Sequence, residues 1–327
     1  MRKNIFTMFL MLAVCIFLSG EAFSAWTQAK GHSYNQLTLS YYKTTKKFTT
    51  IERNASDEIV NTHSRVFRNE EEEFTSSKVT YYGEYGIIDT LTVYGSVPYD
   101  RQRSNDTMKF AGEDGPNGIG DINLGLRYNL VQNLLGSGAL MSLQGEVKIP
   151  EAYHYGHPLE DLSLGDGQYD ATLAILLGRG FGKGYAWLNT GYKYRFENEK
   201  FDPVTFKPSD QLKVSFGGGY PLTSWLSAVA YVAWTKALGN AEVSNELITK
   251  SFETGTAANN HAEGALIQDT LALESSSLNA YAGLQFNITP KWQTVVSYNR
   301  DLSGVGEFKT KNSALGETFG LAVVYVH

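Results

Sequence analysis

Charged side chains alternate with apolar ones in several segments of the chain, and this spacing decides what chemistry they could perform. In residues 118–130 (GIGDINLGLRYNL), Ile, Leu and Tyr fall at every second position, with Asp121 and Arg127 between them. Alternate side chains of a β-strand point to opposite faces, so such a segment has one apolar and one charged face. Charges of both signs on neighbouring strands can form ion pairs or orient a charged solute. The candidate residues are Lys78, Glu84, Asp121, Arg127, Glu146, Lys148, Asp170, Lys193, Arg195 and Lys213, together with Asp100, Glu197 and Asp301.

Metal binding and catalysis have less support in the sequence. His154 and His157 lie in an acidic segment (EAYHYGHPLED) that could hold a metal, but this set matches no complete zinc pattern. A hydrolase site would need a serine within hydrogen-bond reach of a base, and no histidine lies beside a serine in the middle of an alternating segment. We therefore predict no catalytic residue, no metal and no cofactor, and we expect that the protein is not an enzyme.

The alternation identifies the elements that must position these charges. Period-two patterns predict strands. Twelve segments show the pattern: 34–43, 78–85, 90–100, 118–130, 141–150, 168–178, 186–197, 211–220, 226–236, 277–288, 292–301 and 318–327.

The connections between these segments are sorted by length. The connections 86–89, 133–138, 179–184, 221–225 and 289–291 are short, and they alternate with the long connections 44–77, 101–117, 151–167, 198–210, 237–276 and 302–317. A soluble sheet could place its charged face in water, but it gives no reason for such sorting. The pattern predicts an all-β fold, a transmembrane antiparallel up-and-down β-barrel of about 12 strands with short periplasmic turns and long extracellular loops.

The barrel prediction places the charged faces in the lumen. An arginine on the lipid face at mid-bilayer would destabilise a barrel by about 2–4 kcal/mol. We interpret most of these charges as structural ion pairs, since charged side chains in a narrow barrel usually pair. The alternative is a polar conduit that orients a solute.

The ends of the chain carry export and assembly features. Residues 1–24 have the charged, apolar and small-residue regions of a signal peptide, with cleavage after Ser24 or Ala25. We divide the rest into an N-terminal segment, 25–33, and a single barrel domain, 34–327, with long loops at 44–77 and 237–276. Apolar residues alternate to the end of the last strand, which resembles the signal read by the barrel-assembly machinery, although His327 stands where Phe or Trp is usual.

Composition excludes several other classes. Without residues 1–24, 26 basic and 33 acidic residues are left, a net charge of −7, which does not suit a nucleic-acid-binding protein. No other segment has about 18 consecutive apolar residues, so no transmembrane helix is expected. The only cysteine, Cys15, lies in the signal peptide, so we expect no disulfide in the exported chain.

Three motifs in order resemble a known family. The segments GIGDINLGLRY (118–128), LGDGQYD (164–170) and AWLNTGYKYRF (186–196) resemble the outer-membrane proteins of the meta-pathway phenol-degradation and transporter family. The resemblance covers residues 78–327, and residues 44–77 look like an insertion. It implies a barrel in the outer membrane of a Gram-negative bacterium, and passage of aromatic compounds in some members.

Two functional classes follow, with a third held open. The first is a channel or transporter for small solutes, hydrophobic or aromatic ones among them. The second is a structural or surface-interaction barrel with a plugged lumen. The third, an outer-membrane lipid hydrolase, is less favoured, because no histidine lies beside a serine in the middle of a predicted strand. The expected partners are outer-membrane lipid, the barrel-assembly machinery and a small-molecule solute, and no nucleic acid.

Overall fold

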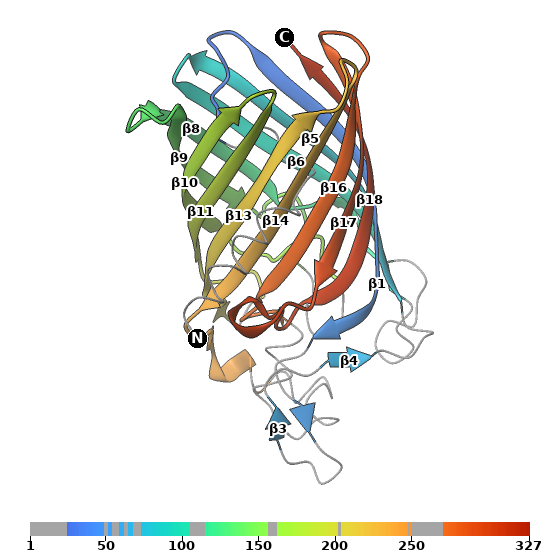
Figure 1. Cartoon of the computed structure of the whole chain (residues 1–327). Helices are drawn as coiled ribbons and strands as arrows, with labels where there is room; N and C mark the ends of the chain where they lie inside the picture. The colour runs from blue at the N-terminus through green and yellow to red at the C-terminus, as the bar shows by residue number, and fades with distance from the viewer. Residues whose placement is uncertain are drawn as a thin grey trace, which may run out of the picture.

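The fold is described by a computed structural model (Figure 1). It describes residues 25–48, 52–53, 59–61, 65–67, 73–104, 115–155, 162–201, 204–247, 249 and 271–327. The predicted signal peptide, 1–24, and His157 lie outside these residues.

Twelve antiparallel strands close into a barrel, as the sequence predicts. Each strand pairs with its neighbours along the chain, and β1 pairs with β18 from Tyr34↔Val326 to Thr44↔Gly316, which closes the wall. Closure leaves the wall without an unpaired edge. The strands are β1 (Ser33–Phe48), β5 (Phe74–Ile88), β6 (Leu91–Ser104), β8 (Ile122–Leu134), β9 (Ala139–Ile149), β10 (Asp170–Phe181), β11 (Gly184–Arg195), β13 (Asp210–Pro221), β14 (Leu226–Leu238), β16 (Ser277–Asn287), β17 (Trp292–Leu302) and β18 (Ala314–Val326).

The short connections lie at one end of the barrel and the long ones at the other (Figure 1). We call these the short-turn end and the long-loop end. The first and last barrel strands meet at the short-turn end, where the backbones of Ser33 and His327 exchange two hydrogen bonds. In the described part of the chain, no helix is long and apolar enough to cross a membrane.

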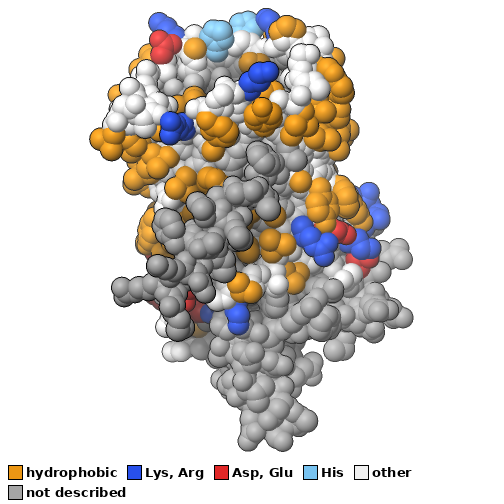
Figure 2. Space-filling model, in the orientation of Figure 1, with side chains coloured by type: hydrophobic (Ala, Val, Ile, Leu, Met, Phe, Trp, Pro, Cys, Tyr) orange, Lys and Arg blue, Asp and Glu red, His pale blue; other side chains and the backbone are white. Residues whose placement is uncertain are grey.

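The two faces of the wall differ in chemistry. Apolar side chains such as Leu124, Leu173 and Phe319 point outward and are 50%, 59% and 54% exposed. Hydrophobic side chains cover much of the outer wall in Figure 2. The opposite positions, Arg127 and Lys148 among them, line the interior. A two-residue period therefore sorts the apolar side chains outward and the charged ones inward.

Two predicted boundaries are wrong. The loop predicted at 44–77 is shorter, because β1 continues to Phe48, β5 begins at Phe74, and the two strands pair as far as Thr44↔Phe74. The strand predicted at 118–130 is broken into β7 (Asn117–Ile119) and β8, both of which pair with β6. The break holds one more residue than the facing part of β6, which is a β-bulge. Pro98 lies opposite this bulge and has no amide hydrogen to donate.

The long connections are less polar than their sequence suggests. Short strands β12 (Phe206–Lys207) and β15 (Glu242–Val243) pair with each other across two of these loops. A buried apolar cluster joins three loops at the long-loop end. It consists of Tyr155, Phe201, Val204, Phe206, Leu247 and Leu273. These loops therefore have a small hydrophobic core of their own.

The outward position of Leu124 gives a test of the wall. We expect that Leu124→Arg impairs assembly, because the cation would enter hydrocarbon at a cost of about 2–4 kcal/mol at mid-bilayer. Asn123→Arg is the matched control, since Asn123 is the next residue and lines the interior. Heat-modifiable mobility of outer-membrane fractions measures both variants. Normal assembly of Leu124→Arg together with failure of Asn123→Arg would show that the faces are reversed.

Candidate functional site

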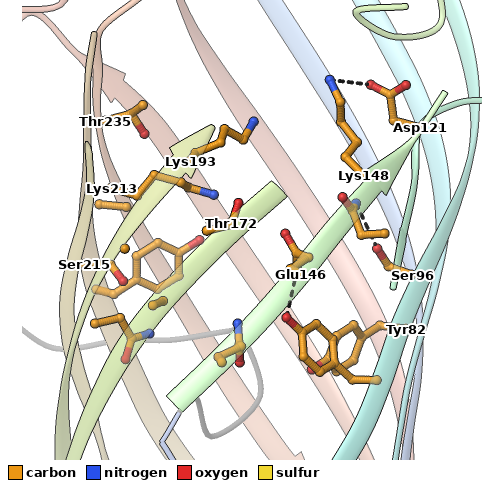
Figure 3. A pocket seen from close by; sticks show the side chains of 18 of the residues that line it. Tyr82, Ser96, Asp121, Glu146, Lys148, Thr172, Lys193, Lys213, Ser215 and Thr235 are labelled. Atoms are coloured by element: carbon orange, nitrogen blue, oxygen red, sulfur yellow. Dashed lines mark hydrogen bonds and ion pairs between the residues drawn. The ribbon is translucent and has the colours of Figure 1, made fainter. Parts of the chain in front are cut away.

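The barrel encloses a cavity of about 850 Å³ (Figure 3). Its wall is formed by side chains from strands on all sides, and most of them are polar. A second cavity of about 270 Å³ lies toward the long-loop end. The two cavities share Lys193, Lys213 and Thr235 in their walls. They therefore form adjoining parts of one polar interior.

The structure brings the predicted residues together around these cavities. The larger cavity is lined by Lys78, Asp121, Arg127, Glu146, Lys148, Lys193 and Lys213. Arg195 lines the smaller cavity, and Glu84 and Asp170 are buried beside bases that line the larger one. Of the additional acids, Asp100 is buried and accepts a hydrogen bond from Ser76, and Asp301 accepts one from Tyr42. Glu197 lies beyond the end of β11 and is exposed, so its predicted inward position is wrong.

Asp170 is the centre of the ion-pair network. Its carboxylate lies 2.8 Å from Lys193 Nζ, 3.0 Å from Lys148 Nζ and 3.7 Å from Arg195 Nε, and its side chain is 1% exposed. These residues come from β9, β10 and β11, where Lys148 and Arg195 lie directly opposite Asp170 in the register. A buried carboxylate needs such compensation. Three bases on one acid leave positive charge for other acids to balance.

Asp166, which lies on a loop, supplies part of the negative charge that balances these bases. Its carboxylate lies 2.8 Å from Lys148 Nζ and 3.4 Å from Arg195 Nη2. The Asp166 side chain is 53% exposed, because it faces the wet interior although the barrel surrounds it. Surrounding protein disfavours its charge, but Lys148, Arg195 and Lys193 outweigh this effect and hold the pKa of the Asp166 carboxyl well below its usual value.

Further hydrogen bonds dock the same loop onto the wall. Tyr153 donates to Asp121 at 2.6 Å, and its hydroxyl accepts from the Gly167 amide at 2.9 Å. The Asn198 side chain donates to the Asp166 carbonyl at 2.9 Å. The neighbouring Leu164 and Gly165 line the larger cavity. The loop therefore narrows the lumen toward the long-loop end.

A second buried ion pair lies nearer the short-turn end. Arg127 Nη1 lies 3.0 Å from Glu84 Oε1, and the two side chains are 3% and 0% exposed. Arg127 also donates to Gln144 at 2.9 Å, and Tyr82 donates to Glu84 at 2.5 Å. This pair joins β5, β8 and β9 from inside.

The N-terminal segment, residues 25–32, is bound to this inner wall. Arg127 donates to the Trp26 carbonyl at 3.0 Å. The Gln28 side chain donates to Glu84 at 2.7 Å, and the Gln28 backbone amide donates to the Thr92 hydroxyl at 2.7 Å. Farther along the same stretch of wall, Ser142 on β9 donates to the Ala25 carbonyl at 2.6 Å. The segment is thus held along the inner wall from β5 to β9, inside the short-turn end of the lumen.

A glycine makes room for this segment. A Cβ atom at Gly86 would collide with the carbonyl oxygens of Gln28 and Ala29. The Gly31 amide donates to the Gly86 carbonyl at 2.8 Å, and the Gly86 amide donates to the His32 carbonyl at 3.0 Å. Close backbone approach of this kind requires glycine.

Sequence reasoning missed the N-terminal segment and Asp166. Residues 25–32 show no alternation, and Asp166 lies between two glycines in a segment that reads as a turn. The only available signals were the hydrogen-bonding side chains of residues 25–32 and the single acid between the two glycines. Among the described residues, no group of three or more His, Cys, Asp and Glu is placed to hold a metal ion, and His154 is exposed.

The barrel resembles known outer-membrane proteins in fold. The COG4313 outer membrane channel from Pseudomonas putida F1 gives a TM-score of 0.67 at 15% identity, covering 94% of this chain and 100% of that chain. NanC porin gives a TM-score of 0.48 at 7% identity over 89% and 98% of the two chains. The translocator domain of autotransporter NalP from Neisseria meningitidis gives a TM-score of 0.44 at 11% identity, covering 91% of this chain and 90% of that chain.

No protein-family model matches the sequence. No curated protein matches it. At 15% identity the likeness to the Pseudomonas channel concerns the fold alone. The resemblance to the meta-pathway phenol-degradation family is not confirmed and stays a prediction.

The Arg127–Glu84 pair predicts non-additive effects on stability. We expect that Glu84→Gln or Arg127→Met lowers the free energy of unfolding by about 3–5 kcal/mol, because each change leaves a buried charge without its partner. The free energy of unfolding should fall by less in the double variant than the sum of the decreases in the two single variants. Urea unfolding of the refolded protein in detergent measures the cycle. Strictly additive losses would mean that the two side chains do not interact.

Asp166 predicts a pH dependence with a definite sign. A carboxyl whose folded pKa is depressed stabilises the fold above its unfolded pKa, about 3.9, and this stabilisation is lost as the pH falls through the folded pKa. Asp166→Asn should therefore be less stable than the unchanged protein at pH 7, and the difference should shrink only below about pH 4. Unfolding midpoints at several pH values test this. A difference that disappears between pH 7 and pH 5 would contradict it.

Proposed function

We propose that this protein is an outer-membrane channel that passes small solutes, including solutes with an aromatic or other apolar body. The observation that carries the proposal is the polar interior cavity of about 850 Å³, which adjoins a second cavity toward the long-loop end. The fold likeness to the Pseudomonas putida channel supports it. Aromatic side chains also line the larger cavity, among them Tyr94, Trp187 and Tyr231.

The proposed orientation places the long loops outside the cell and the short turns in the periplasm, in the outer membrane of a Gram-negative bacterium. Lipid would contact the exposed apolar wall, and the barrel-assembly machinery would recognise β18. Long outer loops and short periplasmic turns are usual in such barrels. In this orientation the N-terminal segment lies at the periplasmic end of the lumen.

A plugged structural barrel is the second candidate, and the N-terminal segment is the observation that favours it. The segment is bound to the wall by several hydrogen bonds. The channel accounts better for the cavity, because a purely structural barrel of this width has no need for an open polar interior. An outer-membrane lipid hydrolase has no site among the described residues that supports it.

Single-channel recording in planar bilayers separates the two candidates. We expect that the refolded full-length mature chain gives discrete, steady open events in potassium chloride. Silence from protein that is folded by the heat-modifiability criterion would favour the plugged barrel.

The N-terminal segment should limit the current. We expect that a chain beginning at Ser33 conducts more than the chain beginning at Ala25, because it lacks the residues that are bound inside the short-turn end. Single-channel amplitudes in the same salt measure the difference. A chain in which residues 25–32 have equal length but consist of Gly and Ser is the control for the specific contacts. Equal conductance of all three would contradict a constriction at this end.

The orientation is tested by surface accessibility. We expect that an epitope tag inserted in the long loop at 237–276 is reached by antibody on intact cells, whereas a tag in the short turn at 222–225 is reached only after permeabilisation. Labelling of the short turn on intact cells would reverse the proposed orientation.

A further inference from the structure

Lys213 is the one lysine of the charge cluster that has no partner within the described part of the chain. Lys148 and Lys193 both lie within 3.0 Å of Asp170. Lys213 has no hydrogen bond or ion pair to any described residue, is exposed to the interior and lies in the walls of both cavities. Figure 3 shows Lys193 and Lys213 on the same side of the cavity, both pointing into it. An unpaired ammonium group at this position is open to an anion from the lumen.

The acids of the charge cluster pair with bases other than Lys213. The cluster contains four bases, Lys148, Lys193, Arg195 and Lys213. Its three acids are Asp121, Asp166 and Asp170, all within ion-pair distance of one or more of the other three bases. Glu146, on β9 like Lys148, also lines the larger cavity, where it accepts a hydrogen bond from Tyr94 at 3.1 Å and pairs with no base among the described residues. Lys213 is therefore the base to which no described acid is paired, and its single charge matches a monoanion.

Neutral hydrogen-bonding groups surround the two lysines. In the strand register, Thr172 lies opposite Lys193, Thr235 lies opposite Lys213, and Ser215 is the next inward residue on β13. All three side chains line the larger cavity. Their hydroxyl groups can donate to a second oxygen of an anion.

An aromatic surface follows on the short-turn side of these residues. Trp187 and Tyr231 line the same cavity, with ring centroids 5.8 Å apart, and Tyr231 stacks on Tyr281 at 5.0 Å. Tyr231 lies opposite Gly217. A Cβ atom at Gly217 would be 2.8 Å from the Trp187 ring, so the absence of a side chain there leaves room for the indole. Gly217 is four residues from Lys213, about 13 Å along the strand.

The geometry points to a binding site for a small organic monocarboxylate with a flat apolar body, its carboxylate between Lys193 and Lys213 and its body toward Trp187 and Tyr231. An apolar wall with a few placed polar groups is the usual form of a small-molecule site. Inorganic anions would use the lysines but not the rings. This inference rests on the proposed function and names the class of solute.

Equilibrium binding tests the site without requiring conductance. Isothermal titration calorimetry uses the full-length mature protein in detergent, with titrations into detergent alone subtracted. The three probes are 3-phenylpropionate, 3-phenylpropanol, which lacks the charge, and propionate, which lacks the ring. We expect that 3-phenylpropionate binds at least about tenfold more tightly than either analogue, as expected for a charge-assisted hydrogen bond and for a buried ring.

Variants assign the binding to Lys213. Lys213→Gln should weaken the binding of 3-phenylpropionate about tenfold or more and leave the affinity for 3-phenylpropanol unchanged. Lys213→Arg should retain most of the affinity for the acid. Lys236→Gln is the matched control, because Lys236 follows Thr235 on β14 but pairs with Glu307 outside the cavity. Neutralising Lys213 leaves no described acid unpaired, so Lys213→Gln should fold, and heat-modifiable mobility checks this.

Each outcome of these experiments either supports or overturns the proposed binding site. Equal binding of the acid and the alcohol, or equal effects of Lys213→Gln and Lys236→Gln, would overturn the site. If Lys213→Gln failed to fold, Lys213→Arg and the contrast between acid and alcohol in the unchanged protein would decide. Steady conductance without binding of the acid would overturn this inference alone. Acid binding in a barrel that is silent in bilayers would contradict the channel and leave the site in place.

Discussion

The need to neutralise charge inside a narrow barrel governs the interior of this protein. The buried Asp170 carboxylate on β10 pairs with three bases on the adjacent strands β9 and β11, and two of those bases also pair with Asp166. The ion pairs that brace β9, β10 and β11 are thus the same ones that dock a long loop into the lumen. Removal of Asp170 would leave three bases, all mostly buried, without this shared acid, which is less favourable than the intact network.

Two constrictions follow from this arrangement and define a chamber between them. At the long-loop end the loop that carries Asp166 narrows the lumen, and at the short-turn end residues 25–32, bound to the inner wall, narrow it. The contacts at the short-turn end are mostly hydrogen bonds that involve backbone groups, whereas those at the long-loop end include ion pairs as well as hydrogen bonds. We therefore expect that the N-terminal segment is released more easily than the loop.

The wall could be predicted from the sequence because it depends on a two-residue period. Leu124 and Arg127 fall on opposite faces whatever their neighbours are, and alternating loop lengths indicate the up-and-down order of strands. The features that narrow the lumen could not be predicted in this way. Trp26 and Asp166 find their partners on strands far away in the sequence, and no periodicity indicates such contacts. The cluster around Phe206 and Leu273 similarly depends on three loops meeting in space.

The central claim is that solute passes through the barrel and that residues 25–32 restrict its passage. The only cysteine, Cys15, precedes residue 25, so a chain beginning at Ala25 has none. A pair of cysteines at Gln28 and Thr92, where the Gln28 backbone amide lies 2.7 Å from the Thr92 hydroxyl, can then fix the segment to the wall. Single-channel conductance of this variant is measured before and after addition of a reducing agent, with each single-cysteine variant as a control. The predicted result is a small conductance in the oxidised protein that rises on reduction only in the double variant. The same conductance in both states would contradict the claim.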